Sequence, residues 1–144
     1  MKLQLDYGSE GLSATIPDNA HVLEMANAPG LDAIEASISL ALRSPIGTPP
    51  LAQLAAGRSS ACVVISDITR PVPNAVILPP ILSVLEEAGI PRERITILVG
   101  TGLHRPNEGE ELVRLVGEPI ATTYHIVNHR AQQRDTLVHL GDTS

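Results

Sequence analysis

Three short apolar runs, separated by stretches with helical spacing, constrain this chain more than any other feature. The runs cover residues 61–65, 95–99 and 124–127. The first run is unbroken, which is typical of a strand buried on both faces of a parallel sheet, and the alternation of such runs with helices is typical of α/β folds. The sequence therefore predicts an α/β core with a βαβαβ order over residues 61–140.

The segments between the runs support helices. The first carries apolar residues at helical spacing, but the pair Pro79-Pro80 means that this helix either starts there or kinks there. The second helix is expected over residues 108–116 and is closed by Gly117. A last strand is expected over residues 137–140. Together these elements predict a Rossmann-like, mostly parallel sheet with flanking helices.

The first part of the chain has a different pattern. Short alternating stretches over residues 2–7, 12–16 and 21–25 predict a small antiparallel strand element within residues 1–27. Helical spacing follows over residues 31–42, and a short helix is expected over residues 50–56. The length of 144 residues is typical of one domain, so we expect a single α/β domain over residues 1–144.

Composition excludes several classes of protein. The formal charge of −6 and the absence of Trp and Phe argue against a nucleic-acid partner, which needs basic and aromatic surfaces. The single cysteine, Cys62, cannot form an internal disulfide, and no apolar run reaches the ~18 residues of a membrane span. We therefore expect a cytoplasmic protein without a membrane partner.

Polar residues follow each predicted core strand. Ligands bind in open α/β sheets at the carboxyl ends of the strands. After the first run, Asp67 is suited to ribose hydroxyls, Thr69 carries a hydroxyl donor, and Arg70 is suited to a carboxylate or phosphate. The alternative is that Asp67 and Arg70 form only a salt bridge or cap the next helix. Position alone does not separate these two interpretations.

The loop after the second run contains Gly100-Thr101-Gly102 and His104. The glycines would allow backbone amides to approach an anion closely, and His104 could exchange protons near neutral pH. A lone loop histidine is more often simply exposed. His125 and His129 are four residues apart, and the sequence around His125 indicates a strand, in which four residues span about 13 Å, so the two histidines do not predict a shared metal ion.

Two motifs together resemble a known family. Asp67-Ile68-Thr69-Arg70-Pro71-Val72-Pro73 is followed, about thirty residues later, by Gly100-Thr101-Gly102-Leu103-His104-Arg105-Pro106. This pair is similar to the nickel-pincer nucleotide-dependent lactate racemases, and specifically to their N-terminal domain. The segment from Ser44 to Leu51, the pair Asn128-His129 and the pair Leu140-Gly141 extend the resemblance over most of the chain after residue 40.

The resemblance implies a cofactor, a reaction and site residues. The cofactor is the nickel-pincer nucleotide, a pyridinium-3,5-bisthiocarboxylic acid mononucleotide that carries nickel. The implied reaction is the racemisation of a 2-hydroxy acid: a histidine removes the hydroxyl proton while hydride passes from Cα to the pyridinium ring. The residues implied as cofactor-binding are Asp67, Ile68, Thr69, Arg70, Thr101 and Gly102, and those implied as catalytic are His104 and Arg70.

The resemblance also implies an incomplete site. The family's cofactor-tethering lysine, its nickel-ligating histidine and its second acid/base histidine have no counterpart in this chain, in which no lysine follows Lys2. The expected partners are therefore a 2-hydroxy acid and the C-terminal domain of the same enzyme, and the chain alone is expected to be inactive. Two alternatives stay open: a non-catalytic module that binds a mononucleotide or phosphate, and an α/β interaction domain.

Overall fold

The computed structural model describes residues 1–8, 10–26 and 28–142. The chain divides into two compact units, Met1–Gly30 and Leu31–Ser144, and each is described by itself. The first unit contains β1 (Lys2–Leu5) and β2 (Leu12–Thr15), which pair antiparallel. The expected strand over residues 21–25 is absent, and Leu23 and Met25 are almost fully exposed. This segment has no buried face that would hold it as a third strand.

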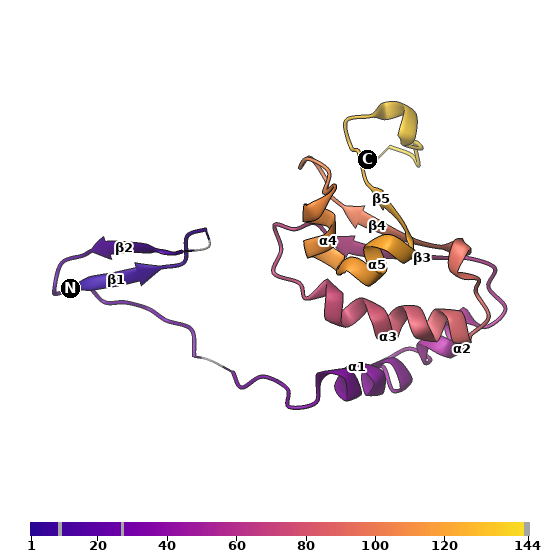
Figure 1. The fold of residues 1–144 in the computed structure, drawn as a ribbon, viewed down its shortest axis with the longest axis horizontal. Helices are drawn as coiled ribbons and strands as arrows, with labels where there is room; N and C mark the ends of the chain where they lie inside the picture. The colour runs from indigo at the N-terminus through magenta and orange to yellow at the C-terminus, as the bar shows by residue number, and fades with distance from the viewer. Residues whose placement is uncertain (9, 27, 143–144) are drawn as a thin grey trace. The chain divides into compact units, whose positions relative to one another are not determined.

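The second unit is built around a parallel sheet (Figure 1). Its strands are β3 (Ala61–Ser66), β4 (Ile95–Gly100) and β5 (His125–Asn128), in the order β3-β4-β5 with both pairs parallel. The predicted fold class is therefore confirmed: a mostly parallel α/β sheet with flanking helices and a separate antiparallel strand pair. The predicted single domain over residues 1–144 stays a prediction.

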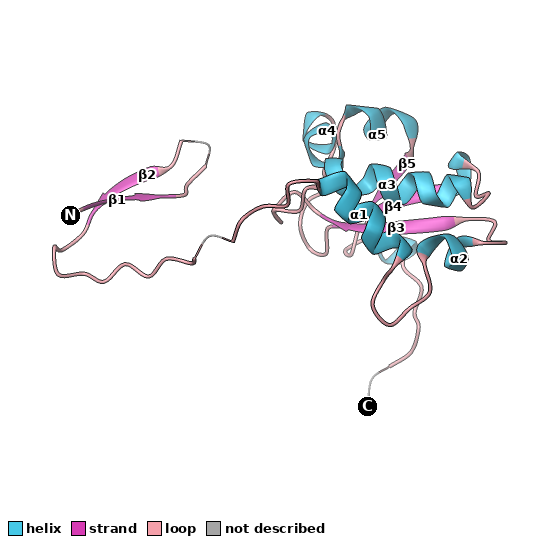
Figure 2. Ribbon diagram, turned by 90° about the horizontal axis from the view of Figure 1, so that it is seen from below, coloured by secondary structure: helices cyan, strands magenta, loops and turns pink. Residues whose placement is uncertain are grey.

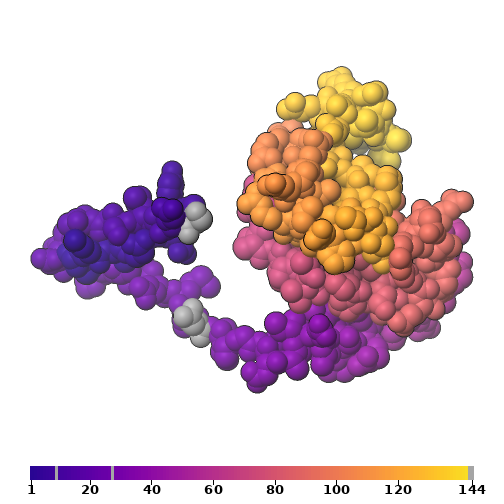
Figure 3. Space-filling model, viewed as in Figure 1, coloured from indigo at the N-terminus to yellow at the C-terminus, as the bar shows by residue number. Residues whose placement is uncertain are grey.

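Helices α3 (Asn74–Glu87), α4 (Glu110–Val116) and α5 (Glu118–Thr123) lie on one face of the sheet (Figures 1 and 2). In the space-filling view, the segments of α3 and α4–α5 form one continuous surface (Figure 3). Helices α1 (Ile34–Arg43) and α2 (Leu51–Ala55) pack against α3. The core between the sheet and these helices is aliphatic; its fully buried residues include Leu78, Leu82, Ile95, Ile97, Val99 and Val116.

Within the described residues of the unit Leu31–Ser144, the other face of the sheet is partly exposed. Burial alternates along the strands, so that every second side chain points away from the helices. In that direction Val64 on β3 is 65% exposed, and Val127 on β5, two strands away, is 38% exposed. Parallel sheets are normally covered on both faces. The apolar row that faces outward consists of Val64, Leu98 and Val127.

Three details of the elements differ from the sequence-based expectations. Helix α3 begins at Asn74, where the carbonyl of Pro73 accepts the backbone N–H groups of Val76 and Ile77, and it does not start at Pro79 or Pro80 but runs through both. Gly117, with φ of 87°, ends α4 and also precedes α5, a helix that the sequence did not predict. The predicted strand over residues 137–140 is absent; a 3₁₀ turn, η2 (Arg134–Thr136), precedes this segment, and Leu140 is 96% exposed.

Candidate functional site at the carboxyl edge of the sheet

The loops that follow β3, β4 and β5 lie at one edge of the sheet. Parallel pairing places Ser66 opposite Gly100, and Val99 opposite Asn128, so that all three strands end together. The backbone N–H of His129 also donates to the carbonyl of Val99, 2.9 Å away. This edge therefore gathers the two motifs that the sequence analysis singled out.

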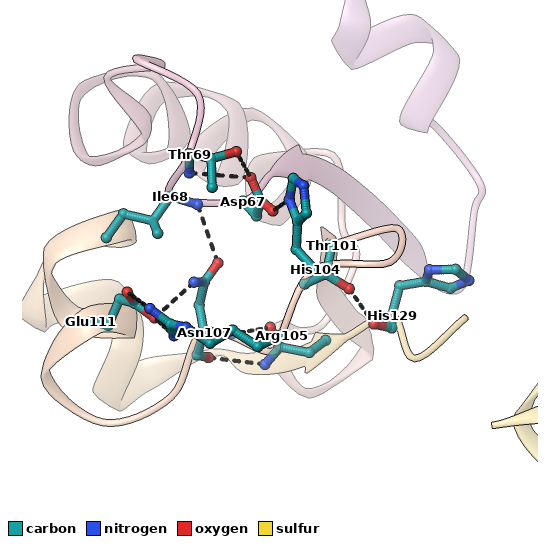
Figure 4. Close-up of polar contacts among 10 residues, drawn as sticks. Asp67, Ile68, Thr69, Thr101, His104, Arg105, Asn107, Glu111 and His129 are labelled. Atoms are coloured by element: carbon teal, nitrogen blue, oxygen red, sulfur yellow. Dashed lines mark hydrogen bonds and ion pairs between the residues drawn. The ribbon is translucent and has the colours of Figure 1, made fainter. Parts of the chain in front are cut away.

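The most direct contact between the two motifs joins Asp67 and His104 (Figure 4). His104 Nδ1 lies 2.5 Å from Asp67 Oδ2. Asp67 is only 3% exposed, whereas the side chain of His104 is 54% exposed. The contact therefore couples a buried carboxyl group to an imidazole that reaches solvent. Sequence reasoning placed both residues at this edge but did not predict that they form a pair.

Hydrogen bonds hold Asp67 in its ionised form. Its Oδ1 accepts from the Thr69 hydroxyl at 2.6 Å and from the Thr69 backbone N–H at 3.2 Å. The hydrogen bonds from Thr69 and His104 keep the pKa of Asp67 below its ordinary value, although burial acts in the opposite direction. Both carboxylate oxygens are thus engaged by protein groups, and the predicted contact of Asp67 with the cofactor stays a prediction.

The rest of the first motif is more open. Arg70 closes the turn with its backbone N–H, which donates to the carbonyl of Asp67 at 3.1 Å, and the residue is exposed. Within the described residues its guanidinium makes no ion pair. Thr69 is also exposed, while Ile68 is half-buried and packs against the core. Arg70 and Thr69 are therefore accessible to a ligand, and Ile68 mainly anchors the turn.

Thr101 and Gly102 differ sharply in their surroundings. Thr101 is 2% exposed, and its hydroxyl donates to the carbonyl of His129. Gly102 is exposed, has φ of 57°, and a Cβ added there would have no atom within 4 Å. Thr101 thus ties two loops together, whereas Gly102 leaves open space beside the backbone. The carbonyl of Thr101 also accepts the His104 N–H at 2.9 Å, which fixes the start of the histidine loop.

Asn107 is a site residue that the sequence analysis missed. It is 2% exposed, and its Oδ1 accepts the backbone N–H of Ile68 at 3.2 Å. Its own N–H donates to Asn128 Oδ1 at 2.8 Å, and its Nδ2 donates to Glu111 Oε2 at 2.9 Å. Asn107 therefore links the loop after β4 to the loop after β3 and to the last residue of β5. The Asn107-Glu108-Gly109 sequence before a helical stretch signals a turn, but it does not reveal these partners.

Arg105 and Glu111 form a second polar contact beside this residue. The guanidinium donates to both oxygens of Glu111, at 2.5 and 2.7 Å. Together with Asn107, Arg105 lowers the pKa of Glu111 to about 2. The charge of Arg105 is therefore already matched within the protein, which distinguishes it from Arg70.

A pocket of about 310 Å³ lies beside the His104 loop. It is lined by residues 102–106 and 129–133, so His104 borders it, whereas residues 67–70 do not. His129 and Arg130 also line this pocket. Arg130 donates to Glu108 at 2.8 Å. His125 lies on the exposed side of β5. Neither His125 nor His129 takes part in the Asp67–His104 contact.

Two kinds of feature are absent from the described residues. Residues 1–8, 10–26 and 28–142 contain no cluster of three or more His, Cys, Asp or Glu side chains arranged for a metal ion. None of the helices in the described part of the chain is both long enough and apolar enough to cross a membrane.

These features define an α/β domain whose polar site lies at the carboxyl edge of a parallel sheet. The chain belongs to the lactate racemase N-terminal domain family, whose model matches residues 7–144. This match confirms the predicted resemblance to lactate racemases.

Individual relatives agree with the family. The chain is 34% identical to the lactate racemase of Lactiplantibacillus plantarum over 143 residues, which covers 96% of this chain and 34% of the relative. It is 27% identical to the lactate racemase of Thermoanaerobacterium thermosaccharolyticum. The structure of the lactate racemase apoprotein from the latter organism matches 98% of this chain and 33% of that chain, with a TM-score of 0.74. The chain thus spans about a third of the length of these relatives.

Proposed function

We propose that this chain is the cofactor-binding part of a racemase or epimerase of 2-hydroxy acids that works with a nickel-pincer nucleotide. Family membership supports the reaction class. The observation that carries the proposal is the meeting of the two motifs at the sheet edge, where a solvent-accessible His104 is bound to the buried Asp67. This arrangement supplies a proton-exchanging group beside groups suited to a nucleotide.

The accessible residues fit a mononucleotide. Arg70 offers an exposed guanidinium, which suits a phosphate or carboxylate. Gly102 offers a backbone with open space beside it, where an anion can approach the amide without meeting a side chain. Thr69 offers a hydroxyl oxygen that can still accept a hydrogen bond from a ribose. The metal would need ligands beyond these residues.

Each residue has a distinct part in the proposed reaction. When bound, the cofactor supplies a pyridinium ring that accepts hydride reversibly. His104 takes the hydroxyl proton of the 2-hydroxy acid and later returns it, as a general base and acid. Arg70 orients the substrate by pairing with its carboxylate. A substrate held this way loses hydride from Cα and later regains it there. When hydride returns to the opposite face of Cα, the stereocentre is inverted.

Ligand binding by the 144-residue chain is the first test. Nicotinate mononucleotide and, separately, inorganic phosphate are titrated into ¹⁵N-labelled protein. We expect amide shifts at Thr69, Arg70 and Gly102, and we expect Arg70→Gln to weaken them strongly. Arg94→Gln is the matched control, because Arg94 precedes β4 and lies at the opposite end of the strand. Titrations without shifts at these three residues contradict the proposal.

The catalytic part is tested in a full-length racemase that contains this chain. Replacement His104→Ala should lower kcat by roughly 10²- to 10⁴-fold, the usual contribution of a general base, while nucleotide binding is retained. The 144-residue chain alone should bind the nucleotide without racemising lactate. If His104→Ala leaves kcat unchanged but Arg70→Gln abolishes binding, the chain is a mononucleotide-binding regulatory module instead.

A further inference from the structure

We propose that Asp67 is a positioning residue: its carboxylate holds the His104 imidazole in the tautomer with hydrogen on Nδ1, which leaves Nε2 as the nitrogen that exchanges protons. The part of this inference that concerns racemisation rests on the proposed function. The contact that supports the inference joins Asp67 Oδ2 and His104 Nδ1 at 2.5 Å, and this contact does not depend on the proposed function.

The donors and acceptors in this contact decide the tautomer. An ionised carboxylate can only accept hydrogen bonds, so a hydrogen-bonded Nδ1 beside Asp67 must carry the hydrogen. A neutral imidazole has hydrogen on one nitrogen only, and its other nitrogen then has a lone pair. Within the described residues, Nε2 of His104 has no hydrogen-bond partner. The lone pair is therefore available to a substrate.

Asp67 is held firmly enough to impose this choice. Its second oxygen, Oδ1, accepts two hydrogen bonds from Thr69, and the residue is 3% exposed. The turn that begins at Asp67 is fixed in addition by the bond from the Ile68 N–H to Asn107 Oδ1. A carboxylate anchored at one oxygen and buried cannot follow a moving imidazole, so the ring must adapt to the carboxylate.

A second histidine–carboxylate contact in the chain lacks these properties. His139 Nε2 lies 3.2 Å from Asp142 Oδ1, and the two side chains are 71% and 95% exposed. Both partners are on a segment without helix or strand. This pair is typical of a surface contact, which contributes little to the stability of a fold. It offers an internal control for the buried pair.

The rival interpretation is a salt bridge that only stabilises the two loops. Replacement Asp67→Asn distinguishes the positioning role from a purely stabilising salt bridge, because the amide has nearly the same shape as the carboxylate but presents an NH₂ group. That group can donate to Nδ1, and the hydrogen of the neutral imidazole then moves to Nε2. In the Ser-His-Asp enzymes the same kind of replacement preserves the geometry but leaves the wrong tautomer.

The tautomer of His104 is measured directly from the ¹⁵N shifts of the imidazole nitrogens, in protein at a pH where the ring is neutral. We expect the Nδ1–H form in the wild-type chain and the Nε2–H form in Asp67→Asn. Thr69→Val should keep the Nδ1–H form, because the carboxylate acceptor remains. Asp142→Asn is the matched control and should leave His104 unchanged.

A predominant Nε2–H form in the wild-type chain overturns the inference, and this result does not require any variant to fold. The same tautomer in wild type and in folded Asp67→Asn also overturns it. In a full-length racemase, Asp67→Asn should lower kcat by about 10²-fold or more, with a much smaller change in KM. If the tautomer changes as expected but no nucleotide binds, the proposed function fails and the positioning role of Asp67 stands.

Discussion

At the scale of single residues, two buried asparagines differ in whether their polar groups are hydrogen-bonded. Asn107 has every polar group of its side chain and backbone paired, with Ile68, Glu111 and Asn128 as partners. Asn74, which is 3% exposed at the start of α3, has a side-chain nitrogen without a partner among the described residues. Burial of a polar group stabilises a fold only when hydrogen bonds compensate for lost water. Asn107 and Asn74 should therefore make very different contributions to the free energy of unfolding.

Replacement of each asparagine by alanine tests this difference. Asn107→Ala leaves the Ile68 N–H without its acceptor in a buried place, so we expect a loss of about 2 kcal/mol in the free energy of unfolding. Asn74→Ala removes an unpaired group and should cost less than half as much. Urea denaturation monitored by circular dichroism measures both. Equal losses would mean that the hydrogen bonds of Asn107 contribute nothing beyond side-chain packing.

The residues of the site were only partly predictable from the sequence. The strand-end rule and the two motifs placed Asp67, Arg70 and His104 at one edge, because parallel strands end together. The partner of each side chain was not predictable, since it depends on loop conformation. Asn107 was missed for this reason: two of its partners, Ile68 and Asn128, lie 39 and 21 residues away in the sequence. The roles assigned to the cofactor-binding residues stay predictions.

At the scale of elements, one carboxylate joins three parts of the chain. Glu86, near the end of α3, accepts from Arg92 at 2.7 and 3.0 Å and from the Tyr124 hydroxyl at 2.6 Å. Arg92 lies in η1 (Arg92–Arg94) and also sits 5.5 Å from the centre of the Tyr124 ring. Tyr124 directly precedes β5. This cluster therefore fixes the end of α3 against the starts of two strands.

The cluster predicts how stability depends on pH. Arg92 and Tyr124 lower the pKa of Glu86 from 4.5 to about 2 in the folded protein. Because the folded value lies below the unfolded one, the stabilisation is present above about pH 4.5 and is lost as the pH falls toward 2. Glu86→Gln should therefore lower Tm at pH 7 and flatten the decrease of Tm between pH 4.5 and 2. Thermal denaturation across this range checks both effects.

Glu110→Gln is the control for this measurement, because Glu110 lies on the exposed face of α4. It should leave the dependence of Tm on pH nearly as in the wild type. A curve for Glu86→Gln that is parallel to the wild-type curve down to pH 2 would contradict the assigned pKa.

The elements themselves were predictable to different degrees. Apolar runs identified all three core strands, although their sheet is buried under helices on one face only, while Val64 and Val127 on the other face are exposed. The segments over residues 21–25 and 137–140 also alternate between apolar and polar residues, but they pair with no strand in the described residues and are without regular structure. Local pattern does not reveal whether a partner is available. Helix α5 was missed because Gly117 indicates a helix end equally well when a second helix follows.

At the scale of the whole molecule, the outward-facing row of Val64, Leu98 and Val127, with Val64 and Val127 exposed and Leu98 half-buried, has a consequence for behaviour in solution. Water in contact with these aliphatic groups is unfavourable, and salts such as sulfate increase the penalty. Among the strands of the described residues, β3 pairs with β4 alone, so the apolar row runs up to an unpaired strand edge. We expect the purified 144-residue chain to associate reversibly as its concentration rises, and more strongly in ammonium sulfate.

Sedimentation velocity over a range of concentrations measures this association. Val64→Lys should reduce it, because a charge on the 65%-exposed position repels a second copy at little cost to folding. Val113→Lys, at a 38%-exposed position on α4 away from the row, should not. Equal association of both variants would place the contact elsewhere. If Val64→Lys associates less than Val113→Lys, self-association of this chain is governed by three aliphatic side chains rather than by its net charge of −6.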